Sequence, residues 1–254
     1  MVDVLITMNS FTAAEVSQEG YQSLFKMIKA AGFSGVEIRR ELLKEELPSV
    51  SDIKTMLNDI GLVGYYSCPI PLFNLNGGLN TEQIKQALLE GQCLDAKLIK
   101  FSLGHYTPDS CMEDLRVLTE TAIGRYCITV ENDQTQEGGK VERLAAFFER
   151  CEKEAISIYF TCDIGNWLYV KEDPSAAIEK MKAHTKYIHI KEVVQAEDGF
   201  TTVAISPHTN FKWKRLQEGH SNATPIAVEF PVDTRSLKDY YSMITEGGAH
   251  YETV

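Results

Sequence analysis

Several features that mark secreted, membrane-spanning or nucleic-acid-binding proteins are missing from this sequence. Its 25 lysines and arginines are outnumbered by 36 acidic residues, and the net charge of −11 argues against binding to nucleic acid or to an anionic membrane surface. No stretch approaches the roughly 18 apolar residues of a membrane span, and the N-terminal MVDVLITMNS is not typical of a signal or transit peptide. The six cysteines form no CxxC pair, which favours reduced thiols. We therefore expect a cytoplasmic protein.

A glycine-rich fingerprint and an interdomain linker are absent as well. Without a Gly-rich turn after the first apolar run, an open doubly wound sheet is the weaker of two fold interpretations. Without a Pro/Ser-rich linker, a charge block or a low-complexity segment, residues 1–254 are expected to form a single domain. Hydrophobic residues make up 44% of the chain, which suits a sizeable core.

Strand-like and helix-like runs alternate along the whole chain, with roughly 30 residues from one strand to the next, the length of a βα unit. The strand candidates are residues 3–8, 35–39, 62–67, 97–102, 126–131, 157–163, 186–191 and 225–230. Helical segments between them have recognisable ends, with Ser51 and Asp173 as N-caps and Gly32 and Gly61 at C-terminal ends. Eight such units in about 250 residues predict an α/β fold, a single (β/α)8 TIM barrel.

Polar residues interrupt these strand candidates always on the same side. Side chains alternate between the two faces of a strand, so in 126–131 Ile128 and Val130 face one way, while Thr129 and Glu131 face the other. The apolar set must face the helices, and the polar set therefore points into the barrel, toward the C-terminal mouth where TIM-barrel active sites lie. The same parity places Glu37, Arg39, Lys100, Asp163, His189, Lys191 and Glu229 inside.

This group holds more acid than a narrow mouth can keep ionised without a compensating cation. Any one of these residues alone could be a solvated loop residue or a hydrogen-bonded interior histidine, but four on consecutive strands with one parity indicate a shared site. Two Glu, one Asp and one His form a mixed oxygen and nitrogen set that suits a divalent metal. Because the set has no thiolate, Mn²⁺ is favoured over Zn²⁺, Co²⁺ or Mg²⁺. The predicted ligands are Glu131, Asp163, His189 and Glu229.

Five segments of the chain carry a resemblance to a known family. In order, GFSGVEIR, ITVEND, TCDIGNW, YIHIKE and IAVEF resemble the xylose isomerase-like TIM barrels of the sugar phosphate isomerase/epimerase superfamily, over essentially the whole chain. In that family a Glu, an Asp, a His and a Glu from the last four strands hold one metal ion, and these match the four predicted ligands. The resemblance implies an isomerase or epimerase of a small sugar, a keto-sugar acid or a sugar phosphate.

The resemblance also implies roles for individual residues. The metal would polarise the substrate's carbonyl and stabilise an enediolate, while Glu131 and Glu229 remove and return the proton. The carbohydrate would be bound by Glu37, Arg39, Lys100, His105, Asn166 and Lys191. Aromatic side chains would close over the sugar, namely Phe73, Trp167 and Trp213. Members of the family often form dimers or tetramers, so a homo-oligomer is also expected.

Particular subfamilies differ from this chain at defined positions. Ketohexose 3-epimerases have a His where this sequence has Asn166 and an Arg where it has Gln195, and dehydroshikimate dehydratases have a His in place of Asp133. DNA-repair endonucleases of the endonuclease IV type need further histidines where this chain has Cys68, Ser102 and Asn166, so a nuclease is not expected. Two alternatives stay open: a metal-dependent sugar-acid dehydratase of the same fold and a non-catalytic sugar-binding barrel.

Overall fold

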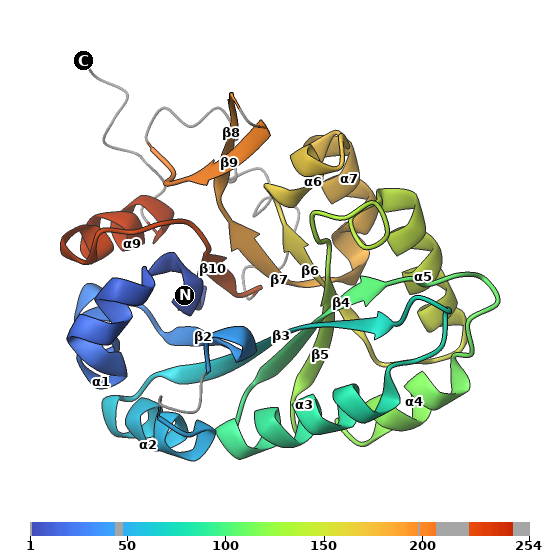
Figure 1. The fold of residues 1–254 in the computed structure, drawn as a ribbon, viewed down its shortest axis with the longest axis horizontal. Helices are drawn as coiled ribbons and strands as arrows, with labels where there is room; N and C mark the ends of the chain where they lie inside the picture. Colours follow the sequence, from blue (N-terminus) through green and yellow to red (C-terminus); the bar gives the residue numbers. More distant parts are fainter. Residues whose placement is uncertain (1, 44–47, 198, 207–223, 246–254) are drawn as a thin grey trace.

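Parallel strands close into a barrel in the computed structural model, which describes residues 2–43, 48–197, 199–206 and 224–245 (Figure 1). The barrel strands are β1 (Val4–Thr7), β2 (Gly35–Arg39), β3 (Val63–Phe73), β4 (Leu98–Gly104), β5 (Cys127–Glu131), β6 (Tyr159–Asp163), β7 (Thr185–Ile190) and β10 (Ile226–Val228). They are paired in the order β1-β10-β7-β6-β5-β4-β3-β2, and β1 also pairs with β2. Because this ring has no edge, the predicted TIM barrel is confirmed and the open doubly wound sheet is wrong.

Helices surround the barrel strands on the outside (Figure 1). They are α1 (Ala13–Ala31), α2 (Val50–Ile60), α3 (Thr81–Leu94), α4 (Glu113–Glu120), α5 (Val141–Lys153), α6 (Asn166–Tyr169), α7 (Pro174–Met181) and α9 (Leu237–Thr245). Short 3-10 turns, η1 (Met8–Ser10), η2 (Arg40–Leu42), η3 (Lys182–His184) and η4 (Thr234–Ser236), adjoin them. No helix in the described part of the chain combines the length and the apolar character needed to cross a membrane.

Local signals fix most of the predicted helix ends. Asp173 caps α7 by accepting a hydrogen bond from the Ala176 N–H, and Gly32 and Gly61 end their helices with φ of 109° and 75°, in the left-handed region. The prediction of Ser51 as the cap of α2 is wrong. Ser49 is the cap, because its hydroxyl accepts from the backbone of Asp52 while the Asp52 carboxylate accepts from the backbone of Ser49.

The barrel interior changes character from one end to the other. At the N-terminal end, five inward side chains form a small buried cluster of their own, hereafter the plug: Leu5, Tyr65, Leu98, Tyr187 and Ala227. One layer further, the hydroxyls of Thr129 and Thr161 are hydrogen-bonded to each other at 2.8 Å. The outward side chains Ile128 and Val130 are buried in the main core instead, which confirms the predicted parity of β5. The plug closes the bottom of the barrel, so the polar layer above it opens only at the C-terminal mouth.

A two-stranded hairpin that the sequence did not predict lies outside the barrel. It consists of β8 (Glu192–Ala196) and β9 (Gly199–Val203), paired antiparallel directly after β7. The ring of Tyr169 packs edge-on against Phe200, with ring centroids 5.6 Å apart, and this contact ties the hairpin to α6. The hairpin therefore brings residues of β9 to the rim of the mouth (Figure 1).

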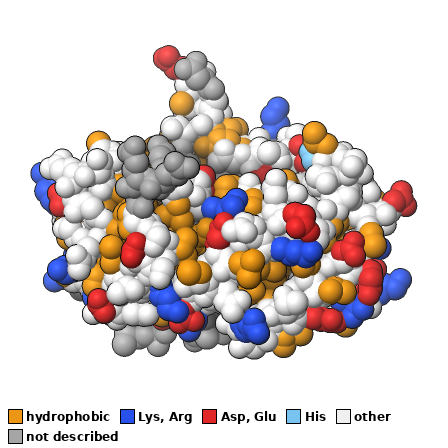
Figure 2. All heavy atoms as spheres, turned by 60° about the horizontal axis from the view of Figure 1, so that its bottom comes forward, with side chains coloured by type: hydrophobic (Ala, Val, Ile, Leu, Met, Phe, Trp, Pro, Cys, Tyr) orange, Lys and Arg blue, Asp and Glu red, His pale blue; other side chains and the backbone are white. Residues whose placement is uncertain are grey.

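Charged side chains of both signs are mixed over the face turned forward in Figure 2, with apolar side chains between them. Some of the surface ion pairs are local: Arg116 contacts Glu113 and Glu120 on α4, and Arg150 of α5 contacts Glu154, one residue beyond that helix. Such exposed pairs add little stability, because water and salt screen their charges. The barrel closure and the core, rather than these pairs, hold the fold.

Candidate active site

Charged side chains from the ends of six barrel strands meet at the C-terminal end of the barrel. We call this group the cluster: Glu37 and Arg39 of β2, Lys100 of β4, Glu131 of β5, Asp163 of β6, His189 of β7, and Lys191 and Glu229 just after β7 and β10. Glu37, Asp163 and His189 are completely buried. Burial of this many charges is tolerable only when they are paired, and the cluster is where the sequence predicted one site.

The four predicted metal ligands lie together. One ligand atom from each of Glu131, Asp163, His189 and Glu229 lies within 4.8 Å of the others. His189 Nδ1 is 2.9 Å from Glu131 Oε1 and 3.0 Å from Glu229 Oε2. Three carboxylates and one imidazole from four strands, converging on one point, form a donor set that fits a divalent cation.

Glu37 fixes the orientation of the histidine. Its Oε2 is 2.8 Å from His189 Nε2 on the side away from Glu131 and Glu229. An imidazole that donates its Nε2 proton to Glu37 keeps the lone pair of Nδ1 directed at those two carboxylates, as a metal ligand requires. The structure thus corrects the substrate-binding role predicted for Glu37: the side chain lies beneath His189, fully buried, and is not among the residues that line the cavity.

Asp163 is held in place by its own loop. Its Oδ1 accepts hydrogen bonds from the N–H groups of Gly165 and Asn166, at 2.9 and 3.0 Å. Its Oδ2 is 2.6 Å from Lys191 Nζ but has no aligned hydrogen-bond donor, so it is available as a ligand. Residue 165 must be glycine for this arrangement, because a Cβ there would lie 2.7 Å from Lys191 Cγ. One oxygen is locked by the backbone, and the other points into the cluster.

The cluster carries a surplus of negative charge. Four carboxylates face three permanent cations, of which Lys100 Nζ lies 2.9 Å from Glu131 Oε1 and 3.1 Å from Glu37 Oε1. Burial raises the pKa of Asp163 to about 7, and the nearby carboxylates of Glu229 and Glu131 oppose the lowering by Lys191. Burial and Lys100 disfavour a proton on His189, yet the surrounding carboxylates raise its pKa well above the usual value. A proton on His189 or a divalent cation in the cluster can neutralise this surplus.

Known structures of the same shape were found by comparison, although no protein-family model and no curated protein matches the sequence. A xylose isomerase domain-containing protein of Salmonella typhimurium is similar with a TM-score of 0.72 and 13% identity, over 95% of both chains. The chain has the xylose isomerase-like barrel fold.

Two further structures of this fold have named activities. An L-ribulose 3-epimerase is similar with a TM-score of 0.64 and 14% identity, over 98% of this chain and 94% of the other. The probable 3-DHS dehydratase of Bacillus anthracis gives a TM-score of 0.67 and 13% identity, over 96% and 99%. The chain also spans 45% of a longer protein, a xylose isomerase-like barrel fused to a 4-hydroxyphenylpyruvate dioxygenase.

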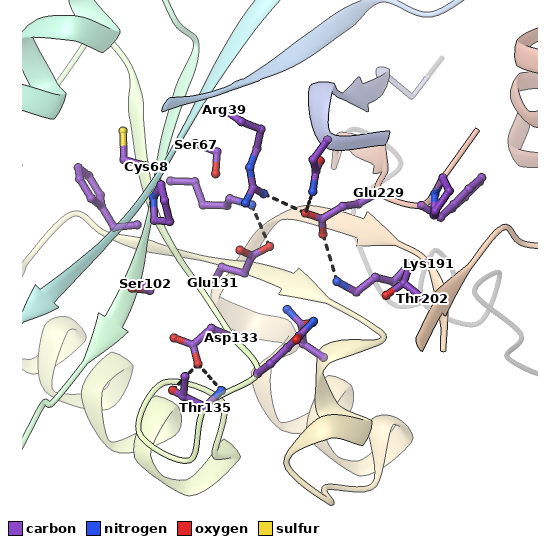
Figure 3. A pocket seen from close by; sticks show the side chains of 18 residues that line it. Arg39, Ser67, Cys68, Ser102, Glu131, Asp133, Thr135, Lys191, Thr202 and Glu229 are labelled. Atoms are coloured by element: carbon purple, nitrogen blue, oxygen red, sulfur yellow. Dashed lines mark hydrogen bonds and ion pairs between the residues drawn. The ribbon is translucent and has the colours of Figure 1, made fainter. Parts of the chain in front are cut away.

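A cavity of about 620 Å³ opens above the cluster of this xylose isomerase-like barrel (Figure 3). Of the predicted substrate-binding residues, Arg39, Lys100, Asn166 and Lys191 line it, whereas His105, one residue beyond β4, does not. The expectation that Phe73 and Trp167 close over a sugar is wrong, because both are completely buried in the core. Trp213 lies outside the described residues.

Some residues of the site were not predicted from the sequence. Asn132 is completely buried and joins β5 to β6: its amide donates to the Asp163 carbonyl and accepts from the Asp163 N–H, both at 2.8 Å. Asn9, just after β1, donates to Glu229 Oε1 at 3.1 Å. Both follow a strand end directly, and that position was an available signal. Thr202 lines the cavity from the hairpin, which was not predicted, and no sequence signal marked this residue.

Proposed function

We propose that the protein is a divalent-metal-dependent isomerase or epimerase of a small sugar, with Glu131 and Glu229 as the proton-transferring pair. The observation that carries the proposal is their placement. The two carboxylates lie on either side of His189 Nδ1, at 2.9 and 3.0 Å, and both line the cavity. Two carboxylates at one reacting centre allow one to remove a proton and the other to return one.

Glu131, Asp163, His189 and Glu229 would hold the metal, with Mn²⁺ as the favoured ion. Bound there, it would act as a Lewis acid that polarises a substrate carbonyl and makes the adjacent C–H more acidic. Glu37 keeps His189 in the orientation that this role needs, through the 2.8 Å contact at Nε2.

Both glutamates start in the form that accepts a proton. In the metal-free protein, burial opposes ionisation, yet Lys191 and protonated His189 hold the pKa of Glu229 well below its usual value, and Lys100 and His189 lower that of Glu131. Glu131 Oε1 pairs with Lys100 and His189, whereas no described residue forms a hydrogen bond or an ion pair with Oε2. Glu131 Oε2 is therefore the oxygen best placed to take the proton from a substrate in the cavity.

The test uses wild type and two glutamine variants, purified without chelator. We expect about one divalent ion per wild-type chain and uptake of solvent deuterium at the carbon next to the carbonyl of a 2-keto sugar. Glu131→Gln is expected to lose exchange by a factor of about 100 or more. Glu142→Gln, an exposed acid on α5 whose carboxylate contacts Lys180, is the matched control and should behave as wild type. Metal-loaded wild type that exchanges no substrate hydrogen would overturn the proposal.

The same samples separate the two alternatives of this fold. A sugar-acid dehydratase would remove the same proton but expel a hydroxide as water, which leaves a conjugated product with ultraviolet absorbance. A non-catalytic barrel would bind metal and sugar without exchange. Of the three candidate functions, only the proposed reaction would give an epimerised or isomerised product that carries one solvent deuterium.

A further inference from the structure

Arg39, the most exposed of the cations that line the cavity among the described residues, is already paired with carboxylates. Its Nη1 lies 2.9 Å from Glu229 Oε1, and its Nε and Nη2 each lie 2.7 Å from Glu41 Oε1. Figure 3 shows Arg39 and Lys191 reaching the Glu229 carboxylate from different sides. The charge of this guanidinium is therefore already balanced by carboxylates, and an anionic substrate group would have to compete with them for its N–H groups.

The two lysines that line the cavity are likewise paired with carboxylates. Lys100 lies between Glu37 and Glu131, at 3.1 and 2.9 Å, and only 2% of it is exposed. Lys191 lies 2.6 Å from Asp163. Arg39 and these lysines are all the cations that line the cavity among the described residues.

The rest of the cavity wall offers neutral groups and one further acid. Ser67 and Ser102, on β3 and β4, present hydroxyls for which the described residues provide no hydrogen-bond partner. Gln134 and Thr202 add an amide and a hydroxyl from the loop after β5 and from the hairpin. Asp133 lines the same wall and uses one oxygen, Oδ1, to accept from the backbone and hydroxyl of Thr135.

From this charge distribution we propose that the substrate is an uncharged sugar, rather than a sugar phosphate or a sugar acid. The inference rests on the proposed function and selects among its substrates. With a divalent ion in place, the charges of the ion and the three cations are balanced by the four cluster carboxylates and by Glu41, the further partner of Arg39, so no net positive charge remains for an anionic substrate group. A phosphate group adds nearly two more negative charges. The described wall offers such a group no unpaired cation to replace its lost hydration, and Asp133 on the same wall would repel it.

The first test compares three sets of compounds of equal carbon length: free 2-keto sugars, their terminal phosphates and 2-keto sugar acids. Deuterium exchange gives kcat/KM, and calorimetric titration of the metal-loaded protein gives Kd. We expect the free sugars to exceed both anionic sets by about 100-fold in kcat/KM and to bind more tightly. Faster exchange or tighter binding of a phosphate or an acid would overturn the inference and leave the proposed function intact. If none of the compounds exchanges, the proposed function fails, and the order of the Kd values still decides the charge preference.

The second test changes the charge of the wall. Asp133→Asn keeps an oxygen that can accept from Thr135 but removes the charge, so the preference for free sugar over sugar phosphate should fall about 10-fold. The control is Asp95→Asn, which makes the same change at an exposed residue before β4, at the opposite end of the barrel, with φ of 61°, a conformation that Asn adopts readily. Because both substrates are measured on each variant, general damage cancels in the ratio. An unchanged ratio in Asp133→Asn, or an equal shift in Asp95→Asn, would contradict the assignment of the preference to the cavity wall.

Discussion

The two ends of the barrel interior are built by the same strands and follow opposite rules. At the N-terminal end, the plug fills the barrel with apolar and aromatic side chains, including Leu5 and Tyr187. Two residues further along β7, the next inward side chain is His189, surrounded by carboxylates. The plug minimises free energy by excluding water, whereas the cluster keeps buried charge that favours metal or proton binding. One strand can thus supply stability at one end and chemistry at the other.

The plug is expected to determine stability with little effect on turnover. Leu5→Ala removes a completely buried side chain and should lower the free energy of unfolding by about 2–5 kcal/mol, while deuterium exchange per folded molecule changes little. Urea unfolding of wild type and variant measures this difference. Leu89→Ala, at a residue of α3 that is 62% exposed, is the control and should change stability by about 0.5 kcal/mol or less. A large loss of exchange in folded Leu5→Ala would show that the two ends are not independent.

The opposite behaviour is expected of Glu37, which lies between the plug and the ligands. Glu37→Gln retains the shape but weakens the acceptor for His189 Nε2, so metal affinity should fall about 10–100-fold. Competition with a metal-sensitive dye measures the affinity. Glu41→Gln is a control on the same segment, since Glu41 contacts Arg39 and not His189. Unchanged affinity in Glu37→Gln would remove its orienting role.

The pH dependence of the metal-free protein tests the same contrast between the apolar plug and the charged cluster. The folded pKa of Asp163 is raised to about 7, above its unfolded value, so the folded state holds a proton that the unfolded state has released. Stability linked to Asp163 is therefore present at low pH and is lost as the pH rises from about 4 to about 7. We expect the Tm of metal-free Asp163→Asn, relative to that of metal-free wild type, to increase as the pH rises across this window. Parallel Tm curves for the two proteins would contradict the raised pKa.

The smallest expected effect lies outside the barrel, at the start of α2. Ser49→Ala removes the capping hydroxyl and should cost about 1 kcal/mol. Ser51→Ala lies within the first turn of the helix and should be nearly neutral. Thermal unfolding of the two variants decides between the cap assigned by the structure and the cap expected from the sequence. A larger loss in Ser51→Ala would favour the latter.

The strands and the convergence of the ligands were predictable because the period of two in a strand decides which side a residue faces. Glu131, Asp163, His189 and Glu229 needed only that rule and the barrel fold. Parity does not give depth, however, and Glu37 was therefore assigned to the substrate although it lies beneath His189.

The hairpin and the position of Trp167 were not predicted correctly, for local reasons. The hairpin was not predicted because β8 follows β7 after a single residue and most of its side chains are exposed, so no buried face marks it. Trp167 was assigned to the mouth because it follows a strand end closely. Its side chain points away from the barrel interior and packs against Phe160 in the main hydrophobic core, with ring centroids 6.1 Å apart. This orientation depends on tertiary packing.

The plug also has a kinetic consequence. Because the plug fills the bottom of the barrel, the described residues leave the mouth as the opening to the cluster. Ligands would therefore enter and leave through the mouth. In the proposed reaction, product would therefore have to leave before the next substrate molecule binds, and it would compete directly with substrate. A metal ion bound at the proposed site, at the closed end of the cavity, would be shielded by a sugar bound above it. Saturating sugar should accordingly slow the removal of the ion by a chelator.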